Sequence, residues 1–354
     1  MARAQGFFVR KSGQIIEKGW DVLGMSLASF IVNPAPGEVP RRWESEGYSE
    51  KPWVEIGFGN GEFLVHLAGE HPERLIVGVE MSLTSVLKTA RRAQREGRSN
   101  VRLLHGDARF VVHEAFADGT VDRIYMNFPC PWPKQRHARR RVTAEGFASR
   151  IAAVLSLGGE FLLTTDEGWY AEEVRHILSQ HPALEVLSFV VNPPHAVTTK
   201  YERKWLASGK DIFTVVFCKV SPWTERRLVK GSMEMHVEIP FRDNLKNRLP
   251  HLVGGEGKEE GVWWRFLEGF WGDDGVALVP VLANDEGFEQ RFLLRLVPRP
   301  ATLLVKVDPV GSPYRTPAVA ATLRAAARII AGPDDETALH ETDGDAVSDQ
   351  EGDA

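Results

Sequence analysis

Short apolar runs alternate with amphipathic stretches over residues 52–220. Five runs have the length and residue types of buried strands: WVEI, LIVGVE, VRLL, DRIYMNF and EFLLTTD. Between them, apolar positions recur every three or four residues, as in helices, and Ser82 and Thr143 stand where an N-cap is expected. This alternation predicts a doubly wound α/β fold with a mostly parallel, seven-stranded sheet and a ligand site at the carboxyl ends of its strands.

The sixth and seventh strands of this pattern, residues 184–191 and 212–220, are joined by a segment with no clear helix. A parallel pair needs a crossover connection, which is usually a helix, whereas an antiparallel pair does not. We therefore expect these two strands to run antiparallel.

The pattern changes after residue 220. Four shorter β-like runs precede one alanine-rich helix, PAVAATLRAAARIIA, which Gly332 and Pro333 end. This predicts a small appended α+β domain. The chain then divides into an N-terminal segment, a ligand-binding α/β domain, the α+β domain and a tail, at residues 1–51, 52–220, 221–331 and 332–354.

Charge is distributed unevenly along the chain. The formal net charge is −5, but residues 332–354 carry nine acidic and no Lys or Arg side chains, which leaves +4 for the rest. Such a tail is typical of disorder. Basic residues cluster just after the fourth strand, at Lys134, Arg136, Arg139, Arg140 and Arg141. A basic cluster beside a ligand site indicates a polyanionic partner.

Composition excludes several classes of protein. Two cysteines, Cys130 and Cys218, cannot build a disulfide framework, so we expect a reducing, cytoplasmic location. The apolar run at residues 22–32 is too short to span a membrane and predicts a buried helix or strand, so no membrane association is expected. The eleven histidines lack metal-ligand spacing, so we expect no metal. The sequence leaves the oligomeric state open.

The first predicted strand runs into a glycine-rich turn, VEIGFGNGEF. A tight strand–helix turn needs such glycines, and so does close approach of the backbone to a ligand; they are Gly57, Gly59 and Gly61. Glu62 stands where the dinucleotide-binding fingerprint requires a third glycine. The spacing, with Glu55 two residues before the first glycine, favours S-adenosylmethionine, because a carboxylate there can pair with its ammonium group.

Two more acids follow the next two predicted strands. Glu80 ends LIVGVE, where a carboxylate can accept hydrogen bonds from both ribose hydroxyls. Asp107 follows the third run, where it can face an adenine amino group. A single acid at a strand end usually caps a helix. Acids after three successive strands predict the rim of an adenosine-sized crevice, so we expect S-adenosylmethionine as the cofactor.

A stiff loop, NFPCPWPKQRH, follows the fourth strand, where the domain would meet its substrate. Its Pro129–Cys130 pair resembles cytosine-C5 methyltransferases, whose cysteine attacks the base covalently. Asn127–Phe128–Pro129 resembles the Asn-Pro-Pro-aromatic loop of amino-group methyltransferases. Trp132 would either stack on a base or anchor the loop.

A third resemblance extends beyond this loop. The strings EIGFGNGEF, VGVE, GDA, DRIYMNFPCPWPKQRH, TTD and TTKYER together resemble bacterial tRNA (guanine-N7)-methyltransferases. The match covers residues 52–220, and its FP-x-PWPK-x-RH and TK-[FY]-E-R strings are highly specific. It implies a Rossmann-like class I methyltransferase fold that transfers a methyl group from S-adenosylmethionine to N7 of a guanine in the variable loop of tRNA.

The resemblance also implies roles for individual residues. It assigns Glu55, Glu80 and Asp107 to the cofactor. It assigns contacts with tRNA or with the guanine to Lys134, Asp166, Thr199, Lys200, Tyr201 and Glu202. The family's loop reads Phe-Pro-Asp-Pro-Trp-Pro-Lys, and its aspartate is often given a catalytic role. Cys130 takes that position here and is the catalytic candidate.

Methyl transfer to guanine N7 tolerates this replacement. N7 is an unprotonated acceptor, so its attack on a sulfonium methyl group removes no proton and gives a general base little to do. The loop then acts mainly by positioning the base. The cytosine-C5 alternative, with Cys130 as nucleophile, lacks both the Glu-Asn-Val string and a second cysteine after the fifth strand. A non-catalytic RNA-binding module with the same fold is the other alternative.

In the predicted α+β domain, the string GVWWRFLEGFWG places Trp263, Trp264 and Trp271 near Arg265. An RNA-stacking surface would use such residues. A small domain also needs large side chains for its core, and we expect that use.

Overall fold

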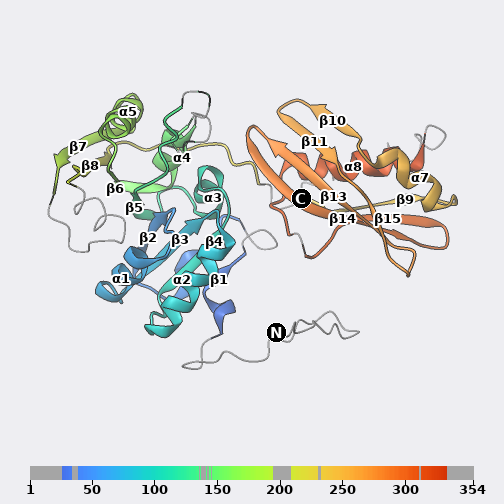
Figure 1. The fold of residues 1–354 in the computed structure, drawn as a ribbon, viewed down its shortest axis with the longest axis horizontal. Helices are drawn as coiled ribbons and strands as arrows, with labels where there is room; N and C mark the ends of the chain where they lie inside the picture. The colour runs from blue at the N-terminus through green and yellow to red at the C-terminus, as the bar shows by residue number, and fades with distance from the viewer. Residues whose placement is uncertain are drawn as a thin grey trace, which may run out of the picture.

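The computed structural model describes residues 26–33, 39–134, 136, 141, 143–144, 146–193, 209–229, 233–310 and 312–332. Within these residues the chain forms two β-sheets, each with its own helices (Figure 1). The first sheet has eight strands and the second has seven. The finer domain limits stay a prediction, and the acidic tail from residue 333 onward lies outside the described residues.

The strands of the first sheet follow the order β1-β4-β3-β2-β5-β6-β8-β7. Their bounds are β1 (Ile31–Val32), β2 (Glu50–Ile56), β3 (Arg74–Glu80), β4 (Val101–His105), β5 (Val121–Asn127), β6 (Leu155–Thr165), β7 (Leu184–Val191) and β8 (Phe213–Lys219). Neighbours from β1 to β6 pair parallel, whereas β8 pairs antiparallel with β6 and β7. The doubly wound fold and its antiparallel last pair are confirmed. The strand beyond the expected seven is β1, whose two residues are too few to show a period.

Helices cover both faces of this sheet: α1 (Glu62–Glu70), α2 (Leu83–Arg95), α3 (Ala108–Ala115), α4 (Phe147–Val154) and α5 (Gly168–Ser179). Buried residues of α1 and α2 pack on one face, and those of α3, α4 and α5 on the other. Ser82 caps α2 as predicted, since its hydroxyl accepts the Ser85 N–H at 3.3 Å. Thr143 does not cap α4, which begins at Phe147; its hydroxyl instead contacts the Tyr170 hydroxyl at 3.1 Å.

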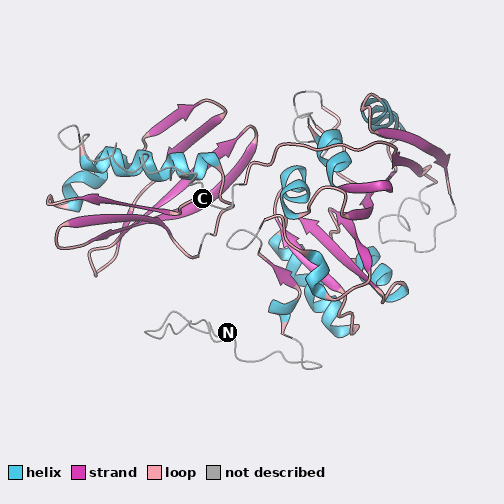
Figure 2. Cartoon of the chain, turned by 180° about the vertical axis from the view of Figure 1, so that it is seen from behind, coloured by secondary structure: helices cyan, strands magenta, loops and turns pink. Residues whose placement is uncertain are grey.

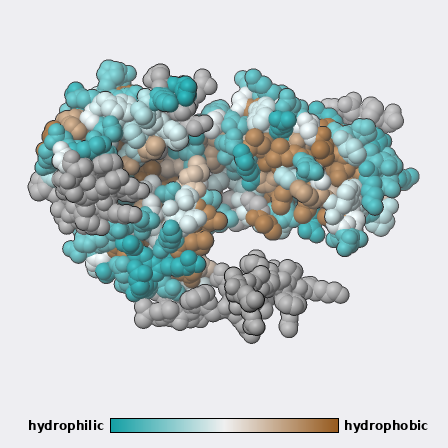
Figure 3. Space-filling model, viewed as in Figure 1, coloured by the Kyte–Doolittle hydropathy of each residue, from teal (hydrophilic) through white to brown (hydrophobic). Residues whose placement is uncertain are grey.

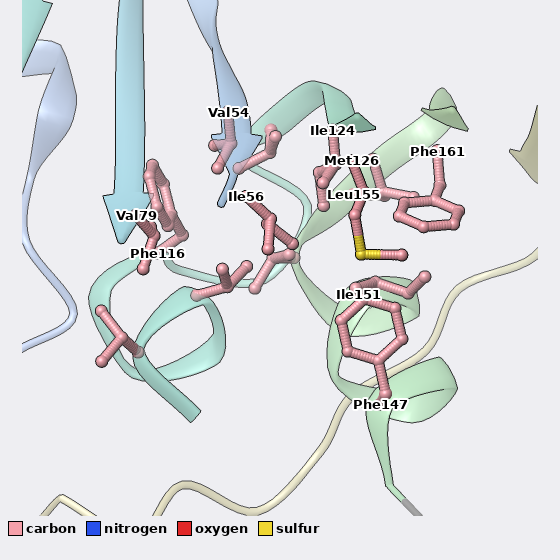
Figure 4. Close-up of a cluster of buried hydrophobic side chains, with 14 of the residues drawn as sticks. Val54, Ile56, Val79, Phe116, Ile124, Met126, Phe147, Ile151, Leu155 and Phe161 are labelled. Atoms are coloured by element: carbon pink, nitrogen blue, oxygen red, sulfur yellow. The ribbon is translucent and has the colours of Figure 1, made fainter. Parts of the chain in front are cut away.

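The core between the sheet and α4 is built from alternate residues of neighbouring strands (Figure 4). Val54 and Ile56 of β2 share a face with Ile124 and Met126 of β5, because strand side chains repeat every second residue. All four are buried, and Phe147 of α4 packs in the same cluster. Burying each such side chain contributes about 1.5–3 kcal/mol. The strands are therefore firmly held, and so are the points at which the loops at their carboxyl ends begin.

The apolar run at residues 22–32 contributes to the edge of this sheet. Its described part forms a short 3-10 helix, Leu27–Ser29, followed by β1. Phe30 is fully buried, and its carbonyl accepts the Leu103 N–H at 2.7 Å. The run therefore docks against β4. Within the described ranges, no helix combines the length and the apolar character needed to cross a membrane.

The second sheet is antiparallel, in the order β10-β11-β13-β14-β15-β9, and β12 pairs with β13. Its elements are β9 (His236–Pro240), β10 (Glu256–Glu259), β11 (Val262–Phe266), β12 (Phe270–Trp271), β13 (Ala277–Asp285), β14 (Phe288–Pro298), β15 (Thr302–Val307), α7 (Leu245–Leu252) and α8 (Pro317–Ala331). Figure 2 shows α8 lying across one face. Figure 3 shows hydrophobic side chains gathered on the opposite face, with hydrophilic ones around them.

The tryptophans of this domain divide between its core and its surface. Trp264 is buried in the core cluster, as expected. The same expectation is wrong for Trp271, which is 39% exposed. The reason is that Trp271 lies on β12, a two-residue strand that pairs with β13 outside the main strand order of the sheet.

The second sheet contacts the first through α3. Phe288 of β14 stacks on Phe110 of α3 with ring centroids 4.8 Å apart, inside the core cluster of the α/β sheet. Glu114, on the same helix, accepts the backbone N–H groups of Leu228 and Val229, both at 3.0 Å. The connecting segment and the tip of the β13–β14 hairpin are therefore both fixed to α3.

Candidate active site

The turn between β2 and α1 holds the three predicted ligand-contacting glycines. All have positive φ: +72° at Gly57, +51° at Gly59 and +68° at Gly61. A Cβ atom on Gly57 or Gly59 would meet open space, whereas one on Gly61 would lie 2.3 Å from Cγ2 of Thr89 on α2. Gly57 and Gly59 therefore leave a cradle beside the turn, and Gly61 lets α1 begin close to α2.

Glu55, near the end of β2, is a buried carboxylate with an unsatisfied oxygen. Only 3% of the residue is exposed. The Asn127 side chain donates a hydrogen bond of 3.3 Å to Oε1, while Oε2 has no hydrogen-bond partner among the described residues. Burial raises the pKa of Glu55 to about 8; the Asn127 hydrogen bond opposes this rise and the charge of Glu80 adds to it. A cationic ligand group at Oε2 would satisfy this oxygen.

Glu80, the last residue of β3, ties the glycine turn to the start of α2. Its Oε2 accepts the Gly59 N–H at 3.0 Å, and its Oε1 accepts the Ser82 N–H at 2.9 Å. A carboxylate oxygen can accept more than one hydrogen bond. Both oxygens of Glu80 can therefore still accept a hydroxyl proton while they hold the turn in place.

Asp107 follows β4 and caps α3. Its Oδ1 accepts the Arg109 N–H at 3.0 Å, and its Oδ2 accepts the Arg109 guanidinium at 2.5 Å. The preceding Gly106 N–H donates to the Glu80 carbonyl at 3.0 Å, which places Asp107 beside the end of β3. The three acids thus lie at one edge of the sheet. An adenine contact by Asp107 stays a prediction, and it would share the carboxylate with Arg109.

The loop that holds Cys130 begins where β5 ends. Asn127 of β5 bonds to Glu55, and the Phe128 N–H donates to the Thr164 carbonyl of β6 at 2.7 Å. Phe128 and Trp132 have φ values of +50° and +44°, which are uncommon for residues with side chains and concentrate at functional sites. Cys130 lies between them and is exposed. The entry of the loop is therefore joined through Glu55 to the group formed by Glu55, Glu80 and Asp107, which is called the acidic pocket below.

Arg141 holds the other end of this loop. It is buried, with 5% exposed. Its Nε donates to the Pro131 carbonyl at 3.0 Å and its Nη2 to the Trp132 carbonyl at 3.2 Å. Its Nη1 pairs with the Glu173 carboxylate of α5, and the guanidinium lies 5.1 Å from the ring centre of Trp169. Assigning Arg141 to a polyanion-binding surface is therefore wrong. Nothing in the sequence distinguishes it from Arg139 and Arg140, which lie outside the described residues.

Only some of the remaining predicted substrate residues are among the residues that the structure describes. Asp166 follows β6 at the same sheet edge and pairs with Lys210 Nζ at 2.8 Å. Lys134 is exposed. The predicted run from Thr199 through Lys200 and Tyr201 to Glu202 lies outside the described residues, between residues 194 and 208. Asp166 is therefore held by Lys210, a residue outside the predicted run.

These features define a class of enzyme. They are a mostly parallel sheet of this strand order, a glycine-rich turn after a central strand and acids after three adjacent strands. Together they are typical of class I S-adenosylmethionine-dependent methyltransferases. The unsatisfied Glu55 oxygen and the cradle at Gly57 and Gly59 fit that cofactor. Among the described residues, no group of three His, Cys, Asp or Glu side chains could hold a metal ion.

Comparisons with known proteins agree with this class. The family model described as "Putative methyltransferase" matches residues 49–215. A tRNA (guanine-N(7)-)-methyltransferase of Thermotoga maritima is 41% identical over 288 residues, 80% of this chain and 91% of that protein. Proteins of the same name from Thermus thermophilus and Aquifex aeolicus are 35% and 30% identical, covering 77% and 78% of this chain and 86% and 93% of theirs.

The chain belongs to the tRNA (guanine-N7)-methyltransferase family. Each of the three alignments is longer than residues 1–220. They therefore extend beyond the α/β sheet into the second domain, which the sequence strings at residues 52–220 did not indicate.

Proposed function

We propose that this chain transfers a methyl group from S-adenosylmethionine to N7 of a guanine in the variable loop of tRNA. The observation that carries the proposal is the hydrogen bond between Asn127 and Glu55, which joins the base of the Cys130 loop to the acidic pocket. The names of the relatives support the reaction and the tRNA substrate. We infer the cytoplasm as its place of action, because both cysteines are free thiols.

The acidic pocket holds the methyl donor in this proposal. Glu55 pairs with its ammonium group, Glu80 accepts its ribose hydroxyls and Asp107 faces its adenine. The backbone at Gly57 and Gly59 approaches it closely, because no Cβ atom fills the cradle. When bound, S-adenosylmethionine supplies an electrophilic methyl group on a sulfonium.

The Cys130 loop and the neighbouring sheet edge position the guanine. N7 carries a lone pair and no proton, so the chain has no proton to remove and its task is orientation. Arg141 fixes the carbonyls of Pro131 and Trp132, which holds the loop in one shape. Lys134, Asp166 and the run Thr199–Glu202 contact the tRNA, and Cys130 takes the place of the family aspartate without a covalent step.

Methyl transfer to a defined transcript tests this function. Purified chain, labelled S-adenosylmethionine and an unmodified tRNA transcript should give 7-methylguanosine, identified by mass spectrometry of the digested product. A matched transcript with adenine in place of the variable-loop guanine should accept no label. Label in 5-methylcytidine, or label that survives the replacement, would overturn the proposal.

A further inference from the structure

A groove on the second domain combines exposed aromatic and cationic side chains. It lies where β9 runs into α7, beside β12, and encloses about 440 Å³. Arg242, Lys246, Trp271 and Pro298 are among the residues that line it. Figure 1 places α7 and β9 at the end of this domain that is farther from the α/β sheet, so the groove is separate from the candidate active site.

The aromatic side chain that lines the groove, Trp271, is only partly covered by the core. It is 39% exposed, although it is a large apolar side chain. Trp271 pairs with Ala277, whose side chain faces the helix-covered core, so the indole lies at the rim of the core beside α7. The indole of Trp271 therefore gives the groove an aromatic surface that packing leaves partly uncovered.

The cations of the groove lack acidic partners. Arg242 and Lys246 are both exposed, and neither forms an ion pair with any residue in the described part of the chain. Lys246 Nζ lies 5.7 Å from the centre of a Trp271 ring. Asp243 also lines the groove, but its carboxylate pairs with Arg248 at 2.6 Å. The groove therefore presents two uncompensated positive charges next to an indole face.

We propose that this groove binds an unpaired nucleotide of the RNA substrate, with Trp271 stacked on the base and Arg242 and Lys246 on the adjacent phosphates. An aromatic platform beside cations is the usual way in which proteins hold single-stranded nucleic acid without reading its sequence. The proposal deepens the tRNA methyltransferase function and rests on it. It makes the second domain a remote anchor that raises tRNA affinity and leaves the chemical step unchanged.

Equilibrium binding of full-length, unmodified tRNA tests this anchor. Stacking on an aromatic side chain contributes about 1–3 kcal/mol, so Trp271→Ala should weaken tRNA binding by about 5- to 150-fold, and Trp271→Phe should restore most of the loss. The double variant Arg242→Gln/Lys246→Gln should lower the slope of log K against log salt by about 1.4–1.8, because each phosphate contact contributes about 0.7–0.9. At saturating tRNA, kcat and cofactor affinity should equal those of the wild type.

Lys258→Gln is the matched control, since Lys258 is exposed on β10 of the same domain and does not line the groove. It should leave the salt slope within about 0.3 of the wild type, well below one phosphate contact. If Lys258→Gln lowered the salt slope as much as the double variant, the attraction would be diffuse and the proposal would be overturned. Wild-type tRNA affinity in Trp271→Ala would overturn it as well. A wild-type dimer in sedimentation that Trp271→Ala dissociates would overturn it in favour of a second copy of this chain.

The test separates this inference from the proposed function. If the wild type methylates the variable-loop guanine but the groove variants bind tRNA normally, only the anchor fails. If the wild type binds tRNA through the groove but forms no 7-methylguanosine, only the proposed reaction fails. Thermal unfolding of each variant identifies loss of fold, and the salt slope of Arg242→Gln/Lys246→Gln keeps the anchor testable if Trp271→Ala unfolds.

Discussion

Arg141, which is buried, and Glu173, which is partly exposed, form an ion pair that connects the Cys130 loop to α5. Arg141 directs its other two guanidinium nitrogens, Nε and Nη2, to the carbonyls of Pro131 and Trp132. A planar guanidinium presents donors in a fixed fork, so one side chain can bind two carbonyls and a carboxylate together. The loop is therefore shaped by a residue outside its own proline-rich string.

Replacing Arg141 by Lys should lower kcat for tRNA methylation by about 10²-fold, because an ammonium cannot reproduce the fork and a small misplacement of a substrate loop has about that cost. Cofactor affinity, measured by calorimetry, should stay at the wild-type value, since Arg141 does not touch the acidic pocket. The matched control is Arg175→Lys on α5, whose exposed pair with Glu172 contributes at most about 1 kcal/mol. Unchanged kcat in Arg141→Lys would contradict the positioning role.

Glu55 makes cofactor binding depend on pH. Its pKa, raised to about 8 by burial, leaves the empty pocket mostly protonated near neutral pH. Pairing with a cationic ammonium needs the carboxylate, so binding should release nearly one proton, and affinity should rise as the pH approaches about 8. Calorimetry in two buffers of different ionisation enthalpy counts this proton. Glu55→Gln should bind more weakly and release none; equal proton release in both proteins would refute the pairing.

The same carboxyl affects the stability of the cofactor-free protein. A folded-state pKa raised from 4.5 to about 8 means that the folded protein binds the proton more tightly than the unfolded chain. Its stabilising effect is full below about pH 4.5 and is lost as the pH rises through about 8. The melting temperature of Glu55→Gln, measured relative to that of the wild type, should therefore rise as the pH increases from about 4.5 to about 8. A constant difference would be inconsistent with a buried, protonated Glu55.

Cys130→Ala should keep at least a tenth of the wild-type methylation rate, because transfer to N7 needs no covalent nucleophile and loss of a weak orienting contact costs about 1 kcal/mol. Cys130→Asp, which restores the family residue, should be at least as active as the wild type. Rates are measured with labelled cofactor. Complete loss of activity in Cys130→Ala, together with a covalent adduct on 5-fluorocytidine RNA, would establish the cytosine-C5 alternative.

Gly61→Ala should destabilise the protein more than a positive φ alone explains. Its Cβ atom would lie 2.3 Å from Thr89, and the site also has φ +68°. Gly119→Ala is the matched control, because Gly119 has φ +71° and its new Cβ would meet no atom within 4 Å, so it should lose only about 1–2 kcal/mol. Chemical denaturation measures both. Equal losses would show that α1 and α2 are not closely packed at this point.

Phe288→Ala should lower the free energy of unfolding by about 3–5 kcal/mol, the usual cost of a buried aromatic residue. Phe288 of β14 is 3% exposed and stacks on Phe110 of α3, which joins the second sheet to the first domain. Val310→Ala, at a residue that is 86% exposed, should change stability by no more than about 0.5 kcal/mol. If the two variants unfold alike, the contact between the sheets contributes nothing to stability.

Features that depend on local order along the chain could be predicted from the sequence. Apolar periodicity predicted the α/β sheet, and the missing crossover helix predicted its antiparallel last pair. The ligand site could be predicted in the same way, because parallel strands bring their carboxyl ends to one edge of the sheet. The residues placed there are the glycines at 57, 59 and 61 and the acids after three strands. The prediction that Trp271 lies in the core was wrong. Composition shows that a small domain needs large apolar side chains in its core, but it does not show which of them lies at the edge of that core.

Pairings between distant residues were decided only by the tertiary structure. Arg141 meets Glu173, Asp166 meets Lys210, and Phe110 meets Phe288, each across segments whose sequence carries no sign of the partner. A charged or aromatic side chain looks the same in sequence whether it lies in water or against a partner. By itself the sequence determined the fold class, the cofactor turn and the family. Which oxygen of Glu55 stays unsatisfied, and which arginine holds the substrate loop, depend on packing in three dimensions, because burial and partner geometry exist only once the chain has folded.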